Sequence, residues 1–274
     1  MRKRMEYIAE IGWNFMGDVD LAEKMISAAS ASGATTCKFQ YWNPEKLKKG
    51  AWDEDGRRQI YEKAKLSEEK ILQLAELCEA NNIKFLMSVF NCEDLQFVTK
   101  FSKRAIKIPS HEVANLELID MALCEMKEVH LSLGACSKEE LMEVADLVDK
   151  RRPNDANVTA MHCVSSYPCE DKNINLPRLD FIKELFNCSL GLSDHTTSAI
   201  VPALAVVKGV SVIEKHFTVD RDLPGRDNKF AMLPNMFKEM VNNCASANNS
   251  LVDHGVEAQE SEKDTIENYR GRWG

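Results

Sequence analysis

The sequence lacks long hydrophobic segments and a clustered basic face. None of its apolar runs approaches the roughly 20 residues that a membrane-spanning helix needs. Lys and Arg total 35 against 43 Asp and Glu, giving a net charge of −8, which argues against nucleic-acid binding. Residues 1–5 are basic, but a strand-like segment follows them instead of the apolar region of a signal peptide. These absences predict a cytoplasmic protein that binds neither nucleic acids nor membranes.

The sequence also lacks any C-x-x-C pair among its nine cysteines, the spacing that is typical of zinc and redox sites. Most of the cysteines lie within apolar strand or helix patterns, as Cys37 and Cys163 do, where cysteine behaves as a small buried hydrophobe. An odd number of cysteines in 274 residues fits a reducing compartment better than a disulfide scaffold. We therefore expect nine free thiols.

The sequence does contain an alternation of short strand-like runs with longer amphipathic segments, repeated eight times. The predicted strands span residues 6–12, 35–41, 84–90, 105–110, 128–134, 158–165, 189–195 and 211–217. The helices that follow are expected to begin near Asp20, Ser67, Cys92, Asn115, Ser137, Arg178, Ser198 and Pro234. Two of these starts, Ser67 and Ser137, have the hydroxyl that is typical of an N-cap, with acids in the first turn.

Eight β–α units without a Pro-, Gly- and Ser-rich linker predict an α/β protein with one domain, residues 1–274, folded as a (βα)8 TIM barrel. An open doubly wound sheet would show the same alternation. The barrel is favoured because polar strand endings occur in nearly all units and because residues 12–17 lack the G-x-G-x-x-G pattern of a dinucleotide fold. The charged segment 42–65 is either a mobile lid or a solvated insertion.

Lysines and hydroxyls occur at matching positions near the ends of the second to fifth strands. Lys38 and Lys107 are expected to face the barrel interior, where a lysine is costly unless it meets an anion. The neighbouring candidates on these strands are Gln40, Ser88, Ser110 and Ser132. Together they predict a pocket for a phosphate and a carboxylate. The alternative is that the lysines extend outward to solvent and that the serines merely end their strands.

Two histidines, His195 and His216, end the last two predicted strands, and each has an acid nearby, Asp194 and Glu214. Adjacent strands can place both imidazoles on one divalent metal ion, with an acid holding each ring in its metal-binding tautomer. His162, on the sixth strand, is either a third ligand or a hydrogen-bonded core residue, and the core position is favoured. The sequence therefore predicts a metal site at this end of the barrel.

Three further carboxylates are candidates for catalysis or substrate binding. Glu10 interrupts an apolar first strand, an expensive place for an acid without a function. The alternative to a catalytic or binding role for Glu10 is a buried salt bridge to Lys38 or Lys107. Glu112 follows the fourth strand and could position water, and Asp227 lies on the loop after the last strand, where substrate contacts are expected.

Taken together, these residues resemble the N-acetylneuraminate (sialic acid) synthase family, whose members condense phosphoenolpyruvate with an aldose. The resemblance covers nearly the whole chain. The matching segments are Glu10-Ile11-Gly12, Lys38-Phe39-Gln40, Lys107-Ile108 with Ser110, Ser132, His162-Cys163 with Tyr167-Pro168, Ser193-Asp194-His195-Thr196, Glu214-Lys215-His216-Phe217-Thr218, and Gly225 with Asp227.

The resemblance implies a role for each matching position. His195 and His216 would hold a divalent cation, Mn²⁺ or Mg²⁺. The residues that would surround phosphoenolpyruvate are Lys38, Gln40, Ser88, Lys107, Ser110, Ser132, Ser165 and Ser193. Those at the sugar would be Glu10, Asn14, Tyr167 and Asp227, with Glu112 handling water. The family also implies a homodimer.

The sequence departs from the family at three places. Asn14 is followed by Phe15 where the family usually has histidine, and Arg226 replaces proline in the family's Gly-Pro-Asp. Full-length members carry a further C-terminal domain that supplies a sugar-binding arginine, and this chain stops near where that domain would begin. One hypothesis is that Arg226 stands in for that arginine and contacts the sugar.

The sequence thus predicts a metal-dependent synthase that joins phosphoenolpyruvate to an aldose, forms a sialic-acid-like 2-keto-3-deoxy sugar acid and releases phosphate. The expected catalytic residues are Glu10, Glu112, Asp194 and Glu214. Two alternatives are a synthase for a different 3-deoxy-ulosonic acid and a metal-dependent aldolase on the same barrel. A third, a non-catalytic barrel that binds sugar phosphates or a protein, is disfavoured by the intact lysine and histidine pairs.

Overall fold

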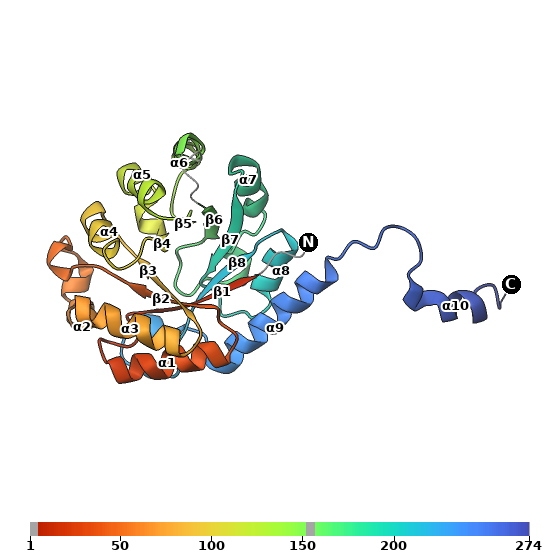
Figure 1. Ribbon diagram of the computed structural model, residues 1–274, viewed down its shortest axis with the longest axis horizontal. Coiled ribbons are helices and arrows are strands. Elements are labelled where there is room, and N and C mark those ends of the chain that lie inside the picture. The colour runs from red at the N-terminus through yellow and green to blue at the C-terminus, as the bar shows by residue number, and fades with distance from the viewer. Residues whose placement is uncertain (1–4, 152–156, 274) are drawn as a thin grey trace.

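The computed structural model describes residues 5–151 and 157–273; the basic residues 1–4 lie outside this part of the chain. Its parallel strands close into a barrel in the order β1 to β8, surrounded by helices (Figure 1). The strands are β1 (Glu6–Gly12), β2 (Thr36–Gln40), β3 (Lys84–Ser88), β4 (Ala105–Ile108), β5 (Glu128–Ser132), β6 (Asn157–Cys163), β7 (Ser189–Asp194) and β8 (Val212–His216). The predicted (βα)8 barrel is confirmed, and the open sheet is excluded.

The helices follow the strands at the predicted places. They are α1 (Val19–Ala31), α3 (Glu68–Ala80), α4 (Cys92–Val98), α5 (Leu116–Glu125), α6 (Lys138–Arg151), α7 (Arg178–Leu185), α8 (Val201–Val207) and α9 (Pro234–Ser250). The predicted N-caps are present, because Ser67 Oγ accepts from the Lys70 amide at 3.3 Å and Ser137 Oγ accepts from the Glu140 amide at 3.1 Å. All nine cysteines are free, as expected.

The segment 42–65 is more ordered than the sequence suggested. It contains two short 3₁₀ turns, η1 (Pro44–Lys46) and η2 (Ala51–Asp53), and the helix α2 (Arg57–Ala64). Only Tyr61 and Ala64 of α2 are buried, so the helix has too few apolar residues to give a periodic signal. This segment covers one side of the barrel's carboxyl end and contributes to the cavity described below.

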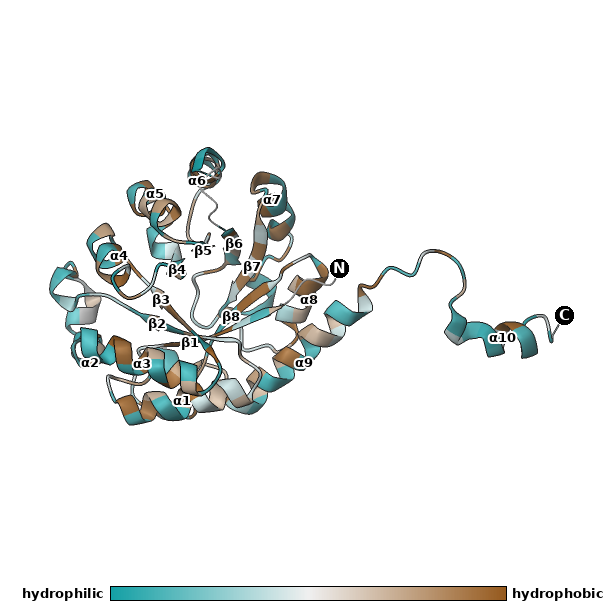
Figure 2. Ribbon diagram, in the orientation of Figure 1, coloured by the Kyte–Doolittle hydropathy of each residue, from teal (hydrophilic) through white to brown (hydrophobic). Residues whose placement is uncertain are grey.

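The inside of the barrel is layered, because alternate side chains of each strand point inward. An apolar layer of Ile8, Leu86, Met161 and Val212 fills the middle. Charged and hydroxyl side chains lie on either side of this layer, toward the two ends of the strands. The outward faces of the strands pack against apolar stripes on the helices, and Figure 2 shows hydrophobic and hydrophilic residues alternating along those helices.

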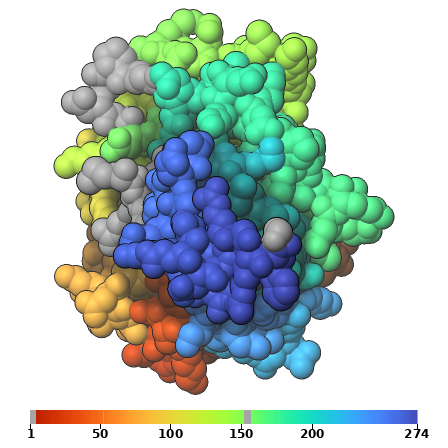
Figure 3. Space-filling model, turned by 90° about the vertical axis from the view of Figure 1, so that its right-hand side faces the viewer, coloured from red at the N-terminus to blue at the C-terminus, as the bar shows by residue number. Residues whose placement is uncertain are grey.

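The chain continues past α9 into a segment that includes the short helix α10 (Lys263–Asn268) and projects away from the barrel (Figure 1). Residues 253–273 are all exposed. Figure 3 is viewed from the side toward which this segment projects, and the segment lies there in front of the barrel. Within the described ranges, no helix has both the length and the hydrophobicity needed to cross a membrane.

Candidate active site

A cavity of about 630 Å³ lies at the carboxyl ends of the strands, the end at which TIM barrels place their active sites. It collects most of the residues predicted from the sequence. Those lining it are Glu10, Lys38, Gln40, Ser88, Lys107, Ser110, Glu112, Ser132, Tyr167, Ser193, His195, Glu214, His216, Arg226 and Asp227. Residues from all eight β–α units therefore converge on one pocket, although they are distant in the sequence.

The floor of this cavity is an ionic cluster of two lysines and two glutamates. Oε1 of Glu214 accepts from Lys107 Nζ at 2.9 Å, and Lys38 Nζ lies 3.4 Å from the same oxygen. Lys38 also pairs with Glu10, the salt bridge considered from the sequence. All four side chains are buried, so the lysines face the interior and do not extend to solvent. The cluster is electrically balanced when all four groups are charged.

The pKa values within this cluster are set by burial and by the opposing charges. Burial would raise the pKa of Glu214, but Lys107 and Lys38 outweigh it and hold this pKa well below the ordinary value. Burial raises the pKa of Glu10 despite Lys38, and burial lowers the pKa of Lys107. Glu214 is therefore the carboxylate that stays ionised and fixes the two ammonium groups in place.

Several hydroxyls next to the cluster have unused hydrogen-bonding capacity. Among residues 5–151 and 157–273, no hydrogen-bond partner is present for the buried Oγ atoms of Ser88 and Ser132. Such groups are rare and usually indicate a ligand or an ordered water. Ser193 Oγ instead donates to Glu214 Oε1 at 2.9 Å, and Ser110 Oγ accepts from the Gly134 amide at 3.1 Å. Lysines and free donors side by side form a site suited to an anion.

Gly134 follows β5 next to these hydroxyls. Because it has no side chain, the segments that carry Ser110 and Ser165 can both approach it closely. A Cβ atom there would lie 2.7 Å from Ser110 Oγ and 2.9 Å from Ser165 Oγ. Ser165 thus lies beside the predicted pocket, although it is not among the residues that line the cavity. Only glycine fits here without displacing the two hydroxyls.

The two predicted metal ligands lie next to each other at the rim. The ring centroids of His195 and His216 are 5.5 Å apart. Nδ1 of His195 lies 2.9 Å from the Val164 carbonyl oxygen, so it carries the proton and leaves Nε2 free to bind a metal. The acid expected to orient this ring, Asp194, does not do so. The expectation was wrong because a backbone carbonyl already occupies Nδ1.

His216 provides the second imidazole. Its buried Nδ1 atom has no hydrogen-bond partner in the part of the chain that the structure describes, and the Asp227 carboxylate lies 3.9 Å away. Burial lowers the pKa of His216 to about 3, which keeps the ring neutral and able to act as a ligand. The neutral imidazole of His216 and the free Nε2 of His195, with a carboxylate beside them, fit a divalent cation. The acid near His216 is therefore Asp227, since Glu214 pairs with the lysines.

Three predicted site residues lie outside the cavity: Asn14, Ser165 and Asp194. Asp194 accepts from Lys215 Nζ at 2.9 Å and from the Thr196 amide at 2.8 Å, on the side of β7 that faces away from the barrel interior. Asn14 is buried and donates through Nδ2 to the Phe217 carbonyl at 3.0 Å. These contacts join segments of the barrel, and neither side chain lines the cavity. His162 likewise binds the Ile174 carbonyl at 2.6 Å and is a core residue.

Sequence reasoning missed an aromatic wall on one side of the cavity. Trp13 stacks on Tyr61 with centroids 3.8 Å apart, and Trp42 lies 4.4 Å from Tyr61 and 5.2 Å from Phe90. Trp13 Nε1 donates to Asp227 Oδ2 at 2.8 Å. These aromatic residues come from three separate segments, the loop after β1, the segment 42–65 and the loop after β3, so no local pattern identified them. The sole available signal was an aromatic residue directly after Gly12 in the first strand-end turn.

Sequence reasoning also underestimated Cys163, which it treated only as a small buried hydrophobe. Its Sγ lies 3.9 Å from Nδ1 of His195 within the cavity. Burial raises the pKa of this thiol and the His195 imidazole lowers it, and the balance puts the pKa at about 7. A buried cysteine with that pKa is not an inert hydrophobe.

Comparison with known proteins identifies the family. A model described as the NeuB family matches residues 25–255 of the chain. The chain belongs to this family. Among its relatives is the pseudaminic acid synthase of Campylobacter jejuni, which is 32% identical over 269 residues, covering 94% of this chain and 78% of the relative. The N,N'-diacetyllegionaminic acid synthase of Legionella pneumophila is 32% identical over 257 residues, covering 89% and 72%.

A solved NeuB-like structure has the same fold. It is the N-acetylneuraminic acid synthetase of Leptospira borgpetersenii in complex with citrate, with a TM-score of 0.86 and 30% identity. The match covers 96% of this chain and 90% of that structure. The family resemblance stated from the sequence is therefore confirmed, and the relatives named here are synthases of pseudaminic, N,N'-diacetyllegionaminic and N-acetylneuraminic acids.

Proposed function

We propose that this NeuB-family protein condenses phosphoenolpyruvate with an aldose to give a sialic-acid-like 2-keto-3-deoxy sugar acid and inorganic phosphate. The observation that carries the proposal is the buried pair Lys38 and Lys107 next to the unpartnered hydroxyls of Ser88 and Ser132. Phosphoenolpyruvate bears a phosphate and a carboxylate, and each needs cationic or hydrogen-bonding groups in a site shielded from water. The names of the related synthases support the same reaction class.

The lysine side of the cavity would bind phosphoenolpyruvate. Lys107 and Lys38 supply positive charge, and hydroxyls donate to the phosphate and carboxylate oxygens from Ser88, Ser110, Ser132 and Ser165. Ser193 lies in the same pocket, where its hydroxyl donates to Glu214 and holds that carboxylate in place. Glu214 holds both ammonium groups in fixed positions before the anion arrives, so little reorganisation is needed on binding. Gln40 donates to Glu10 Oε1 at 3.0 Å and keeps that carboxylate at the edge of the same pocket.

The rim of the cavity would hold a divalent cation, Mn²⁺ or Mg²⁺, through His195 and His216. Such an ion acts as a Lewis acid that polarises the carbonyl oxygen of the aldose. Two features of the rim support this role: the Val164 carbonyl sets the tautomer of His195, and burial keeps His216 neutral. Histidine nitrogens suit Mn²⁺ better than Mg²⁺, which prefers oxygen ligands.

The aldose would bind between the histidines and the aromatic wall. Tyr167 lies 4.1 Å from His195, centroid to centroid, and the Arg226 guanidinium lies 5.0 Å from the Tyr167 ring. With Asp227, these groups present a cation, a hydroxyl and a carboxylate to a polyhydroxylated substrate. The new carbon–carbon bond would join C3 of phosphoenolpyruvate to the aldehyde carbon. Water then adds at C2 and phosphate leaves, with Glu112, at the mouth of the cavity, positioned to accept a proton from that water.

The direct test combines phosphoenolpyruvate and Mn²⁺ with a panel of acetylated and non-acetylated aldoses, including N-acetylmannosamine, and measures released phosphate and product mass. Phosphate release that requires both substrates, with a product mass equal to the aldose plus pyruvate, is expected. Substituting both His195 and His216 by alanine should abolish turnover. Carbon–carbon bond formation from pyruvate itself, without phosphate release, would favour the aldolase instead.

The role of Arg226 has its own test. Arg226→Ala should raise the KM for the aldose and leave the KM for phosphoenolpyruvate unchanged, because Arg226 lies on the aromatic side of the cavity. Arg104→Ala, on the exposed surface, serves as the control. An unchanged aldose KM in Arg226→Ala would exclude the assignment.

A further inference from the structure

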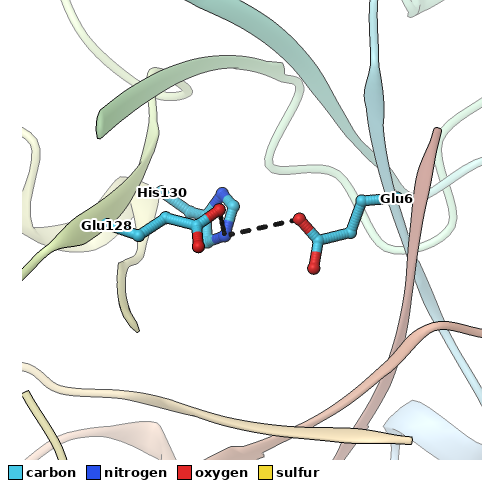
Figure 4. Close-up of side chains that lie close together, drawn as sticks. All are labelled: Glu6, Glu128 and His130. Carbon is cyan, nitrogen blue, oxygen red and sulfur yellow. Dashed lines mark ion pairs between the residues drawn. The ribbon is translucent and has the colours of Figure 1, made fainter. Parts of the chain in front are cut away.

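A second group of potential metal ligands lies at the opposite, amino-terminal end of the barrel. Glu6 begins β1, while Glu128 and His130 lie on β5 and share its inward face. Figure 4 shows both carboxylates directed toward the imidazole ring from these two strands. The apolar layer of Ile8, Leu86, Met161 and Val212 lies between this group and the cavity at the other end. The group is therefore separate from the proposed active site.

The distances within this group match those around a single metal ion. Nε2 of His130 lies 3.4 Å from Glu128 Oε1 and 3.9 Å from Glu6 Oε2, and one ligand atom from each residue falls within a mutual 4.8 Å. Two ligands bound tetrahedrally to zinc at about 2.0 Å lie roughly 3.3 Å apart. Small side-chain movements would thus bring all three onto one ion.

The imidazole is a buried donor without a full set of partners. His130 is only 1% exposed, and no described residue forms a hydrogen bond with its Nδ1 atom. Burial lowers the pKa of His130 despite the opposing charges of Glu6 and Glu128. Nε2 is the ring nitrogen that faces the two carboxylates, so a metal ion between them would bind its lone pair while Nδ1 carries the proton.

The surroundings hold one of the carboxylates in a ligand-like orientation. Oε1 of Glu6 accepts from Thr36 Oγ1 at 2.7 Å and from Lys84 Nζ at 3.1 Å, which leaves Oε2 facing the histidine. Hydrogen bonds of this kind to the second oxygen are typical of carboxylates that bind metals.

A solvent route leads to the group. A cavity of about 660 Å³ at this end of the barrel is lined by Glu6 and Glu128, together with the polar side chains of Asn157, Thr159 and Ser189. Ions can enter there, and water can occupy the coordination positions that the protein leaves open.

We propose that Glu6, Glu128 and His130 form a divalent-cation site that links β1 to β5 across the base of the barrel. One imidazole with two carboxylates suits a zinc-class ion of low coordination number better than Mg²⁺ or Ca²⁺, which prefer oxygen ligands alone. The site is structural, because residues at the amino-terminal end of a TIM barrel contribute to stability rather than to catalysis.

The experiment measures zinc binding in a variant that lacks the histidines at the other end. The double variant His195→Ala/His216→Ala, stripped of metal and dialysed against micromolar Zn²⁺, is expected to bind about one equivalent and to melt at a higher temperature than without zinc. Adding Glu128→Gln should weaken binding at least about tenfold, a loss typical of removing one charged ligand, and remove the thermal shift. Adding Glu76→Gln, an exposed mid-helix control, should change neither.

Loss of folding can be separated from loss of the site. Glu128 is 29% exposed, so its conversion to glutamine should leave the metal-free melting temperature nearly unchanged. If the double variant does not fold, the otherwise unaltered chain should bind one zinc fewer when Glu128 is replaced. The proposal is overturned if the double variant binds no zinc, or if Glu128→Gln binds zinc as tightly as its parent.

Discussion

Replacing Glu214 by glutamine should destabilise the protein, because it removes one carboxylate from a buried cluster of four charges. Glu214 Oε1 receives Lys107 at 2.9 Å, Ser193 at 2.9 Å and Lys38 at 3.4 Å. At an effective dielectric constant of about 20, each lysine attraction is worth roughly 5 to 6 kcal/mol before desolvation is counted. After desolvation, removing one partner of a buried pair costs about 3 to 5 kcal/mol.

Urea unfolding at pH 7.5 with EDTA, followed by tryptophan fluorescence, measures this loss. In a separate thermal unfolding experiment, the expected decrease in melting temperature is roughly 6 to 20 °C for a chain of this size. Glu76→Gln, exposed in the middle of α3, is the matched control and should lie within about 0.5 kcal/mol of the parent. Inorganic phosphate should stabilise Glu214→Gln more than the parent, because the variant leaves two lysines facing one carboxylate. If the unfolding free energy of Glu214→Gln lay within about 1 kcal/mol of the parent's, the proposed contribution of the ionic cluster to stability would be refuted.

Three further predictions concern the anion pocket and two buried residues outside the cavity. Gly134→Ala should raise the KM for phosphoenolpyruvate about tenfold or more (1.4 kcal/mol), since its Cβ would push against Ser110 and Ser165; an unchanged KM in steady-state assays would exclude these hydroxyls from the anion site. Lys215→Met should cost about 3 to 5 kcal/mol in urea unfolding by leaving buried Asp194 unpaired, and a stable variant would contradict this. Burial lowers the pKa of His162 below its unfolded value near 6.5, so the unfolded state binds the proton first and stability falls as pH decreases below 6.5. The contribution is at most about 1.4 kcal/mol per pH unit, and His162→Gln should show a correspondingly shallower pH dependence; equal slopes would disprove it.

The sequence predicted the eight strands and most helix starts because local covalent geometry produces these signals. Alternating side chains predicted that Lys38 and Lys107 face inward, and capping hydroxyls marked the helices after Ser67 and Ser137. The helix α2 escaped prediction because it buries only two residues, and one of them, Tyr61, stacks on Trp13 from a distant segment of the chain.

The sequence by itself therefore determined the fold, the family resemblance and the side of each strand on which the polar residues lie. Only the tertiary structure decided their partners. Asp194 and His195 are adjacent in the chain, but successive strand residues point to opposite faces, so Asp194 meets Lys215 outside the barrel while His195 meets His216 inside. Contacts such as Glu214 with Lys107, or Glu6 with His130, depend on how the closed barrel brings non-neighbouring strands together, which no local pattern encodes.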